Sequence, residues 1–245
     1  MKRLLIFLLA APVTTAAQQL DKMPADLETQ LALSALPADL QAGATVYLLD
    51  PAKGYYVGRQ GTNGFVCFID RTDWEWGQFR NDVFAPISFD PAGASTTFQV
   101  YRDVAAMRAT GTYTAAQVKD TVIARYRSGR YTAPARAGVS YMLAPVMRVY
   151  IGNPDNTTVQ TMSMPHYMFY APYITDADAG TNHNSGPFLN NPDNMIFGDR
   201  KGPQGYFIVT ADERLTAKIL ADNKGLLQRL QAYSHFFMPD MDMSH

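Results

Sequence analysis

The sequence predicts a single α+β domain with a mainly antiparallel sheet and several packed helices. The chain has 245 residues, of which 47% are hydrophobic and 12% aromatic, enough to build one large core. Strand-like and helix-like segments alternate unevenly along it, which is typical of α+β proteins. No internal repeat or low-complexity block divides it, so we expect residues 18–245 to form one domain.

Residues 1–17 have the features of a cleaved export signal. Lys2 and Arg3 precede an apolar run from Leu4 to Val13, which is followed by small residues. A membrane-spanning helix needs about 20 apolar residues, and neither this run nor any later one is that long. We therefore expect an exported protein, periplasmic or secreted, without an integral membrane segment.

The charge of the chain argues against a nucleic-acid partner. Removal of the leader would leave 19 basic and 22 acidic residues, a formal net charge of −3 without a basic cluster. The single cysteine, Cys67, lies in an apolar run of strand type, so we expect a buried and unreactive thiol. The sequence does not indicate an oligomeric state.

The N-terminal half is predicted to form helical turns and then a β-rich region. Leucines at near-helical spacing between Pro24 and Leu40, with an interruption at Pro37, predict a short helix and a second turn. Three β-rich runs follow, at residues 46–50, 55–62 and 65–70. Asn63-Gly64 between the last two is typical of a tight hairpin. The third run lacks strict alternation, so we expect it inside the sheet, with both faces covered.

Helices are predicted at residues 97–109 and 114–128. The second begins with a capping box of Thr114 and Gln117, and its apolar positions have the spacing of a helix that lies on a sheet. Strand-like runs follow at residues 139–143, 146–151 and 205–210. Thr210 with Glu213 predicts the start of a helix, and helical spacing resumes after Gly225 and continues to Tyr233.

Several common enzyme signatures are absent. The sequence has no G-x-S-x-G elbow, no phosphate-binding glycine loop, no H-E-x-x-H motif and no C-x-x-C-H haem motif. The familiar hydrolase, nucleotide-binding and zinc-protease motifs are therefore excluded, whereas unfamiliar enzymes are not.

The strongest candidate site is the segment from Met162 to Gly205, which we expect to be a long irregular loop. Such loops often carry binding sites. Its imidazole, phenol and carboxylate groups could bind a small molecule or a metal ion, through His166, Tyr170, Tyr173, Asp176 and His183. Packing of the aromatic rings in the core is the alternative. Asp176-Ala-Asp178 also faintly resembles a calcium loop, although its glycine comes one position early.

The C-terminal tail, residues 238–245, is rich in methionine and histidine. Thioethers and imidazoles suit copper, especially Cu(I). The candidate ligands are His235, Met238, Met241, Met243 and His245. A frayed terminus without function is the alternative.

Trp74-Glu75-Trp76 holds both tryptophans of the chain. In an extended backbone the two rings would share one face and could stack on a sugar or an apolar ligand. A role in the core or at an edge is the alternative.

Four strings carry a resemblance to a family of exported bacterial proteins of uncharacterised function. They are GTNGFVC at residues 61–67, SGRY at 128–131, YMLAP at 141–145 and HYMFYAPY at 166–173. The resemblance spans about Leu33 to Thr175 and implies export and a shared fold, but no chemistry.

Three functions remain open from the sequence. The leading hypothesis is an exported protein that binds a small ligand or metal through residues 162–205, with His166 as its principal polar group. The second is a hydrolase in which His166 is the general base and Asp176 or Asp178 orients it. The third is a non-catalytic surface or assembly protein, which would present a large exposed apolar patch.

Overall fold

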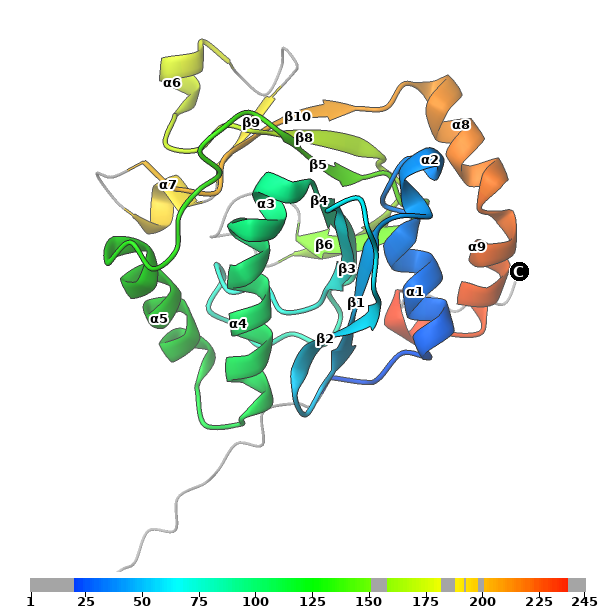
Figure 1. Ribbon diagram of the computed structural model, residues 1–245, viewed down its shortest axis with the longest axis horizontal. Coiled ribbons are helices and arrows are strands. Elements are labelled where there is room, and N and C mark those ends of the chain that lie inside the picture. Colours follow the sequence, from blue (N-terminus) through cyan, green and yellow to red (C-terminus); the bar gives the residue numbers. More distant parts are fainter. Residues whose placement is uncertain (1–19, 151–157, 182–187, 192, 198–200, 238–245) are drawn as a thin grey trace, which may run out of the picture.

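The computed structural model describes residues 20–150, 158–181, 188–191, 193–197 and 201–237. They form a single α+β domain in which helices cover both faces of a large, twisted mixed sheet (Figure 1). The predicted fold class is confirmed.

The helices and strands follow the chain in a mixed order. They are α1 (Ala25–Leu33), α2 (Ala38–Gln41), β1 (Thr45–Asp50), β2 (Gly54–Arg59), β3 (Val66–Asp70), β4 (Ala85–Phe89), α3 (Pro91–Ser95), α4 (Thr97–Ala109), α5 (Ala115–Arg127), β5 (Val139–Met142), β6 (Met147–Tyr150), β7 (Val159–Met162), β8 (His166–Tyr170), α6 (Asp176–Ala179), β9 (Phe188–Asn190), α7 (Asp193–Ile196), β10 (Tyr206–Thr210), α8 (Glu213–Asp222), α9 (Lys224–Gln231) and the short 3₁₀ helix η1 (Ser234–Phe236).

The sheet has the strand order β2-β1-β3-β4-β5-β8-β10-β9, and β6 and β7 form a separate two-stranded sheet. All neighbours pair antiparallel except β1 and β3, which are parallel. The predicted hairpin at Asn63-Gly64 is therefore wrong. The hairpin is the earlier one, between β1 and β2, where Gly54 has φ +89°. Asn63 instead folds its loop back, with its Nδ2 donating to the Leu40 carbonyl.

β3 lies inside the sheet, as predicted, because its two faces pack against different helices. Cys67 and Ile69 join the cluster built by Leu27 and Leu31 of α1, whereas Phe68 packs with the residues of α4 on the other face. The Cys67 side chain is fully buried, and burial raises the pKa of its thiol to about 12. The prediction of a buried, protonated cysteine is confirmed.

The two ends of the described chain meet on one face of the sheet. Leu226 and Leu230 of α9 belong to the same cluster as the apolar face of α1. At the surface of this contact, Arg229 donates to Gln30 at 2.6 Å and pairs with Asp26. Figure 1 shows α1 and α9 side by side, to the right of the sheet.

On the opposite face, α4 packs on the sheet and α5 packs on α4. Val118 and Val122 of α5 lie in one cluster with Val100 and Val104 of α4. Arg125 pairs with Asp103 at 2.7 Å across the same helices. The spacing of its apolar residues predicted that α5 lies on the sheet. That prediction is wrong, because α5 packs on α4 and forms an outer layer.

Helix starts are partly as the sequence predicts. The capping box at Thr114 is formed, with its hydroxyl accepting from the Gln117 N–H. The start of α8 was predicted at Thr210, but Asp212 is its cap and accepts the Leu215 N–H at 2.7 Å.

The segment from Met162 to Gly205 is less irregular than predicted. It contains β8, which lies between β5 and β10 in the middle of one half of the sheet, and the short elements α6, β9 and α7. Residues 166–170 alternate, so that His166 and Met168 are buried whereas Phe169 is 45% exposed. A structureless binding loop is therefore wrong for this part of the chain.

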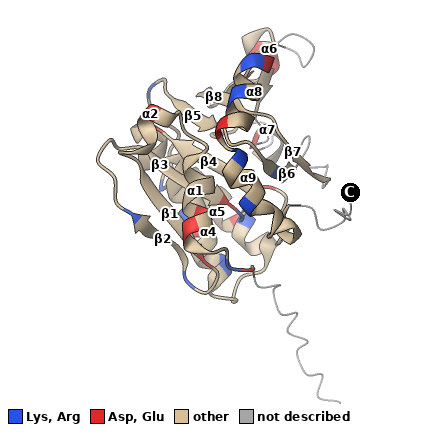
Figure 2. Ribbon diagram, turned by 90° about the vertical axis from the view of Figure 1, so that its right-hand side faces the viewer, with Lys and Arg blue, Asp and Glu red and all other residues tan. Residues whose placement is uncertain are grey.

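Charged residues of both signs are mixed over the surface, for example along α8 and α9 (Figure 2). In the described part of the chain, no helix is long and apolar enough to cross a bilayer.

Candidate functional site

A cavity of about 190 Å³ opens where β4, β5, β8 and β10 face the segment that follows β3. His166 lies on its wall, so we call it the His166 cavity. It continues the core cluster of the α4 face, and apolar side chains such as Ile87 and Ile208 form part of its lining. Most of the remaining lining falls into three groups, carboxyls, methionines and aromatic rings, and His166, Asn190 and Gln204 complete it.

The carboxyl group of the cavity consists of Asp70, Asp73 and Glu75. Asp70 ends β3, and its Oδ1 accepts the Thr72 N–H at 2.9 Å, which turns the chain so that Asp73 comes back toward it. The Asp73 carboxyl comes close enough to the Asp70 carboxyl for a hydrogen bond to form between them. Such a bond requires a proton on one of the two carboxyls.

Loss of solvent makes Asp73 and Glu75 weak acids. Burial, followed by the charge and hydrogen bond of Asp70, raises the pKa of Asp73 well above its ordinary value of 3.8. Burial and then the charge of Asp193 raise the pKa of Glu75 to about 8. Asp193 lies behind the cavity lining, is fully buried, and has its own pKa raised by burial to about 7. Perturbed acids in a cavity are typical of functional sites.

His166 presents one ring nitrogen to the cavity. Its Nδ1 lies 2.7 Å from the Met164 carbonyl oxygen, and a carbonyl can only accept, so the proton is on Nδ1. Nε2 therefore carries a lone pair, and it has no hydrogen-bond partner among the described residues. The side chain is 3% exposed, and burial lowers the pKa of His166 below 6.5. The imidazole is thus neutral at pH 7.

Four methionines, Met142, Met147, Met164 and Met168, also line the cavity. They come from β5, β6, β8 and the turn before β8. Their thioether sulfurs are soft, polarisable groups in an otherwise acidic and aromatic lining.

Trp76, Tyr101, Tyr150 and Tyr206 supply the aromatic part of the lining. Trp76 and Tyr150 stack with ring centroids 4.0 Å apart and planes 5° from parallel. Trp74, in contrast, is 2% exposed and packs in the core cluster between α4 and α5. The two tryptophans therefore do not form the shared face considered from the sequence, and only Trp76 lines the cavity.

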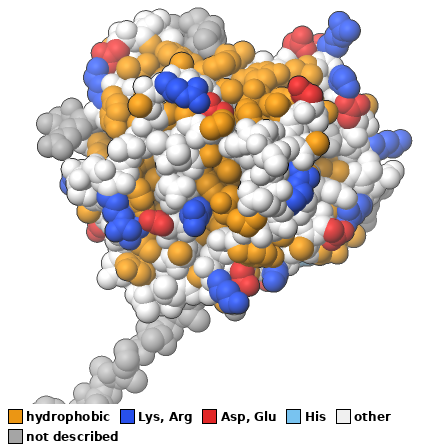
Figure 3. Space-filling model, in the orientation of Figure 1, with side chains coloured by type: hydrophobic (Ala, Val, Ile, Leu, Met, Phe, Trp, Pro, Cys, Tyr) orange, Lys and Arg blue, Asp and Glu red, His pale blue; other side chains and the backbone are white. Residues whose placement is uncertain are grey.

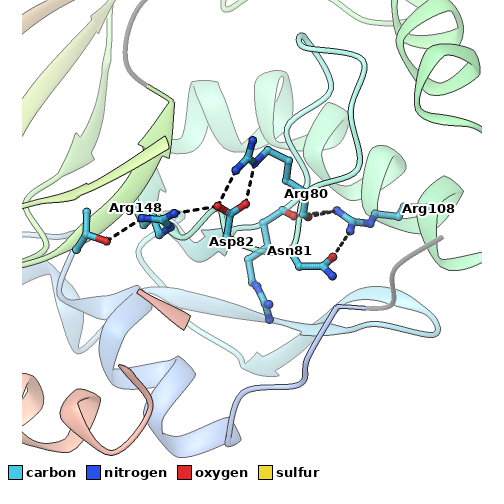
Figure 4. Close-up of polar contacts among 7 residues, drawn as sticks. Arg80, Asn81, Asp82, Arg108 and Arg148 are labelled. Atoms are coloured by element: carbon cyan, nitrogen blue, oxygen red, sulfur yellow. Dashed lines mark hydrogen bonds and ion pairs between the residues drawn. The ribbon is translucent and has the colours of Figure 1, made fainter. Parts of the chain in front are cut away.

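An arginine network connects the segment between β3 and β4 with α4 and β6 (Figure 4). Asp82 accepts from Arg80 at 2.7 Å and from Arg148 of β6 at 2.9 Å. Arg80 is the main cause that holds the pKa of Asp82 down to about 2. Arg108 of α4 donates to the Arg80 carbonyl at 2.8 Å and to Asn81. The network ties α4 and β6, both of which contribute lining residues, to one loop.

Of the five residues predicted to bind a ligand, the structure places only His166 on this cavity. Tyr170 lies on the same strand, but its hydroxyl donates to Asp90 at 2.9 Å, where Asp90 caps α3. Tyr170 therefore holds α3 on the sheet. His183 lies outside the described residues.

Tyr173 and Asp176 lie away from the lining. Tyr173 is 49% exposed and has φ +62°, and it borders a separate hollow with Arg127 and Lys201. Asp176 accepts from Thr181 at 2.7 Å, and Asp178 accepts from Thr175 at 2.8 Å and pairs with Lys201. The described part of the suggested calcium loop is thus the capped helical turn α6. Neither carboxylate is the hydrogen-bond partner of His166, which bonds to the Met164 carbonyl.

Of the proposed copper ligands of the tail, the structure describes His235 alone. His235 is partly exposed and its ring lies 4.1 Å from that of Phe236, centroid to centroid. Met238, Met241, Met243 and His245 lie outside the described residues. Within the described ranges, no three His, Cys, Asp or Glu side chains are grouped so that they could hold one metal ion.

The carboxyls and the methionines of the cavity are the residues that our sequence reading missed. The run Asp70-Arg-Thr-Asp73-Trp-Glu75-Trp76 places three acids directly after a buried strand, a position where polar side chains come to the edge of a sheet. The three acids are thus a signal separate from the two tryptophans of the same run.

The opposite face of the same strands carries an exposed apolar surface. Outward-facing residues of β5, β8 and β10 form two rows across the strands: Val139, Phe169 and Phe207 in one row, and Tyr141, Tyr167 and Val209 in the other. Phe169 and Val209 are 45% and 39% exposed. Hydrophobic side chains gather over β8 and β10 in Figure 3.

Comparison of the chain with protein-family models, with curated proteins and with solved structures gave no match.

Proposed function

We propose that the protein binds a small cation in the His166 cavity. One observation carries this proposal: the described lining residues include three carboxyls and a neutral imidazole, but no lysine or arginine. A carboxylate in a low-dielectric site is unstable unless it is protonated or balanced by positive charge. A bound cation would supply that balance, and the carboxyls would release protons as it entered.

The size and the aromatic lining of the cavity support a small ligand. A cavity of about 190 Å³ is close to the ~150 Å³ cavity that accommodates benzene. The rings of Trp76, Tyr101 and Tyr206 offer π faces and edges that would favour a cation by roughly 0.5–2 kcal/mol each where a face is presented. A small ammonium group fits these conditions, as does a metal ion whose ligands include donors other than carboxyl and imidazole groups.

A buried amide adds a polar contact. Gln204 is 5% exposed and lines the cavity, and its Nε2 makes no well-formed hydrogen bond in the described part of the chain. An unsatisfied buried donor costs about 1–3 kcal/mol. An oxygen atom of a ligand, or of a water that accompanies it, would satisfy this donor.

Thermal unfolding of the full chain tests the proposal. Choline and its neutral isostere 3,3-dimethylbutan-1-ol would be compared, together with Ca²⁺, Zn²⁺ and Cu(I). A ligand at 100 times its Kd stabilises by about 2.7 kcal/mol, which raises the Tm of a chain of this size by roughly 5–10 °C. We expect at least one cation to do so, and the neutral isostere not to.

Charge-removing variants identify the site. Asp73→Asn and Glu75→Gln should weaken cation binding, whereas Glu213→Gln, a change at an exposed acid of α8, should not. Equal stabilisation by choline and by its neutral isostere, or equal cation binding in all three variants, would contradict the proposal.

The Asp70–Asp73 pair favours acid–base catalysis as a second candidate function. Two carboxyls that share a proton can act as a general acid and a general base in turn. This pair replaces the arrangement considered from the sequence, in which Asp176 or Asp178 would orient His166. If the chain hydrolyses any of a panel of chromogenic ester or glycoside substrates, Asp73→Asn should abolish turnover. Turnover that survives in Asp73→Asn would exclude the pair.

A further inference from the structure

His166 has the hydrogen-bond arrangement of a metal-binding histidine. Ligating histidines usually donate their second N–H to a carboxylate or a backbone carbonyl, which fixes the tautomer and the orientation of the ring. Here Nδ1–H donates to the Met164 carbonyl at 2.7 Å. Nε2 is left with its lone pair, without a partner, on a side chain that is 97% buried and lines the cavity.

Methionines lie next to His166 in the sheet and in the turn before it. Met142 is the direct cross-strand neighbour of His166 in the β5–β8 pair, so the Cβ atoms lie about 5 Å apart on the same face. Met168 follows His166 by two residues and points to the same face, about 7 Å along the strand. Met164 supplies the carbonyl that holds the ring and also lines the cavity. Met142 therefore lies opposite His166 on the neighbouring strand, and Met164 and Met168 lie two residues from it along the chain.

We propose that the His166 cavity binds one cuprous ion, through Nε2 of His166 and the thioethers of Met142, Met164 and Met168. Thioethers and a neutral imidazole form a soft donor set that selects Cu(I) over hard cations such as Ca²⁺ and Mg²⁺. This inference rests on the proposed cation-binding function and names the cation. The carboxyls Asp70, Asp73 and Glu75 can release protons as the ion enters and so balance its charge, while the sulfur and nitrogen donors hold it.

The competing explanation is that these methionines only fill irregular space in the core, which is their commonest role. Substitution of a methionine by leucine distinguishes a packing role from a ligand role. Leucine nearly matches methionine in volume and usually costs little stability at a packed site, but it has no sulfur donor. A filler methionine therefore tolerates leucine, whereas a ligand does not.

The test is a competition between the full chain and the chromogenic Cu(I) chelator bicinchoninate, under anaerobic reducing conditions. We expect one Cu(I) per chain. Met142→Leu and Met168→Leu should each lower the affinity by more than about tenfold, because even changes behind a metal ligand cost 10–100-fold. Met107→Leu is the matched control: Met107 is equally buried, in α4, and packs in a different cluster. Thermal unfolding of each variant shows whether it is folded.

The methionine-rich tail is tested in the same assay. A full chain with Met238→Leu, Met241→Leu and Met243→Leu combined should keep its high-affinity Cu(I). Loss of binding in this triple variant together with normal binding in Met142→Leu would place the copper on the tail and overturn the inference. Absence of Cu(I) binding altogether would also overturn it. In that case, stabilisation by choline that depends on Glu75 would leave the proposed function standing, and no stabilisation by any cation would remove both.

Discussion

Glu75→Gln is expected to change how the stability of the protein depends on pH. Glu75 is 6% exposed, and its carboxyl lies among Asp70, Asp73 and Asp193, with the phenols of Tyr101, Tyr126, Tyr150 and Tyr206 nearby. In the folded chain its pKa is about 8, compared with 4.5 when exposed. Between these values the folded state keeps a proton that the unfolded state has lost.

The sign and the size follow from this difference. Below pH 4.5 Glu75 is protonated in both the folded and the unfolded state, and its burial then costs no ionisation energy. Between pH 4.5 and about 8 the folded state binds more protons than the unfolded state, so the free energy of unfolding falls as the pH rises. One pH unit corresponds to about 1.4 kcal/mol, so the full shift is worth ~5 kcal/mol. Part of this free energy is the repulsion between the Glu75 and Asp193 carboxylates. Removal of the Glu75 charge therefore also makes Asp193 easier to ionise. Glutamine, which never ionises, avoids the loss.

Urea unfolding from pH 5 to pH 9 measures the effect. Wild type and Glu75→Gln should differ little at pH 5, and at pH 9 the variant should be more stable by up to about 5 kcal/mol, or roughly 10–20 °C in Tm. Glu213→Gln is the control, since Glu213 is exposed. Parallel stability curves for wild type and Glu75→Gln across this range would refute the view that Glu75 is a buried, protonated acid.

Three further predictions concern residues outside the cavity. Thr114→Ala removes the capping box of α5 and should lower the unfolding free energy by about 1 kcal/mol in urea titrations; an unchanged midpoint would contradict this. Tyr170→Phe removes the hydrogen bond to Asp90 and should cost about 0.5–1.5 kcal/mol while cation affinity stays the same. Weaker cation binding in that variant would return Tyr170 to the site. Cys67 should react with a thiol reagent only as fast as the protein unfolds, and rapid labelling of the native protein would show that it is accessible.

Local signals predicted helices better than strand partners. The bounds of α4 match the expected residues 97–109, and the cap of α5 is as expected, because both depend on neighbours within four positions. The strands that pair with β3 could not be predicted from such local patterns. Gly64 does have the positive φ, +79°, that Asn-Gly favours, but its turn leads away from β2, and β3 pairs with β1 and β4 instead.

β8 shows why a strand can be predicted as a loop. Its residues His166 to Tyr170 are nearly all aromatic or apolar, so the inward and outward positions differ little in polarity even though they alternate in burial. Pro165 and Pro172 on either side reinforced the interpretation as a loop. β4, at Ala85–Phe89, was missed as well, because it is short and has a proline at its second position.

The site was predictable only in part. His166 was chosen for its chemistry, and the structure places it on the cavity. Its partners come from residues 70–76, 142 and 168, and these segments meet through the pairing of β3 with β4, of β4 with β5 and of β5 with β8. Tyr170 was predicted to bind a ligand through its phenol group, but its hydroxyl points to the cap of α3.

The contact between α1 and α9 has a consequence for how the chain matures. Gln30 and Arg229, which bond across this contact, are 199 positions apart. A ribosome adds about 5–20 residues per second, so α1 waits on the order of 10–40 s before α9 exists. During that time Leu27 and Leu31 lack the leucines that later cover them. The nascent chain therefore exposes the apolar side of α1 until α9 has been synthesised. A chaperone that binds α1 would delay the folding of the whole domain.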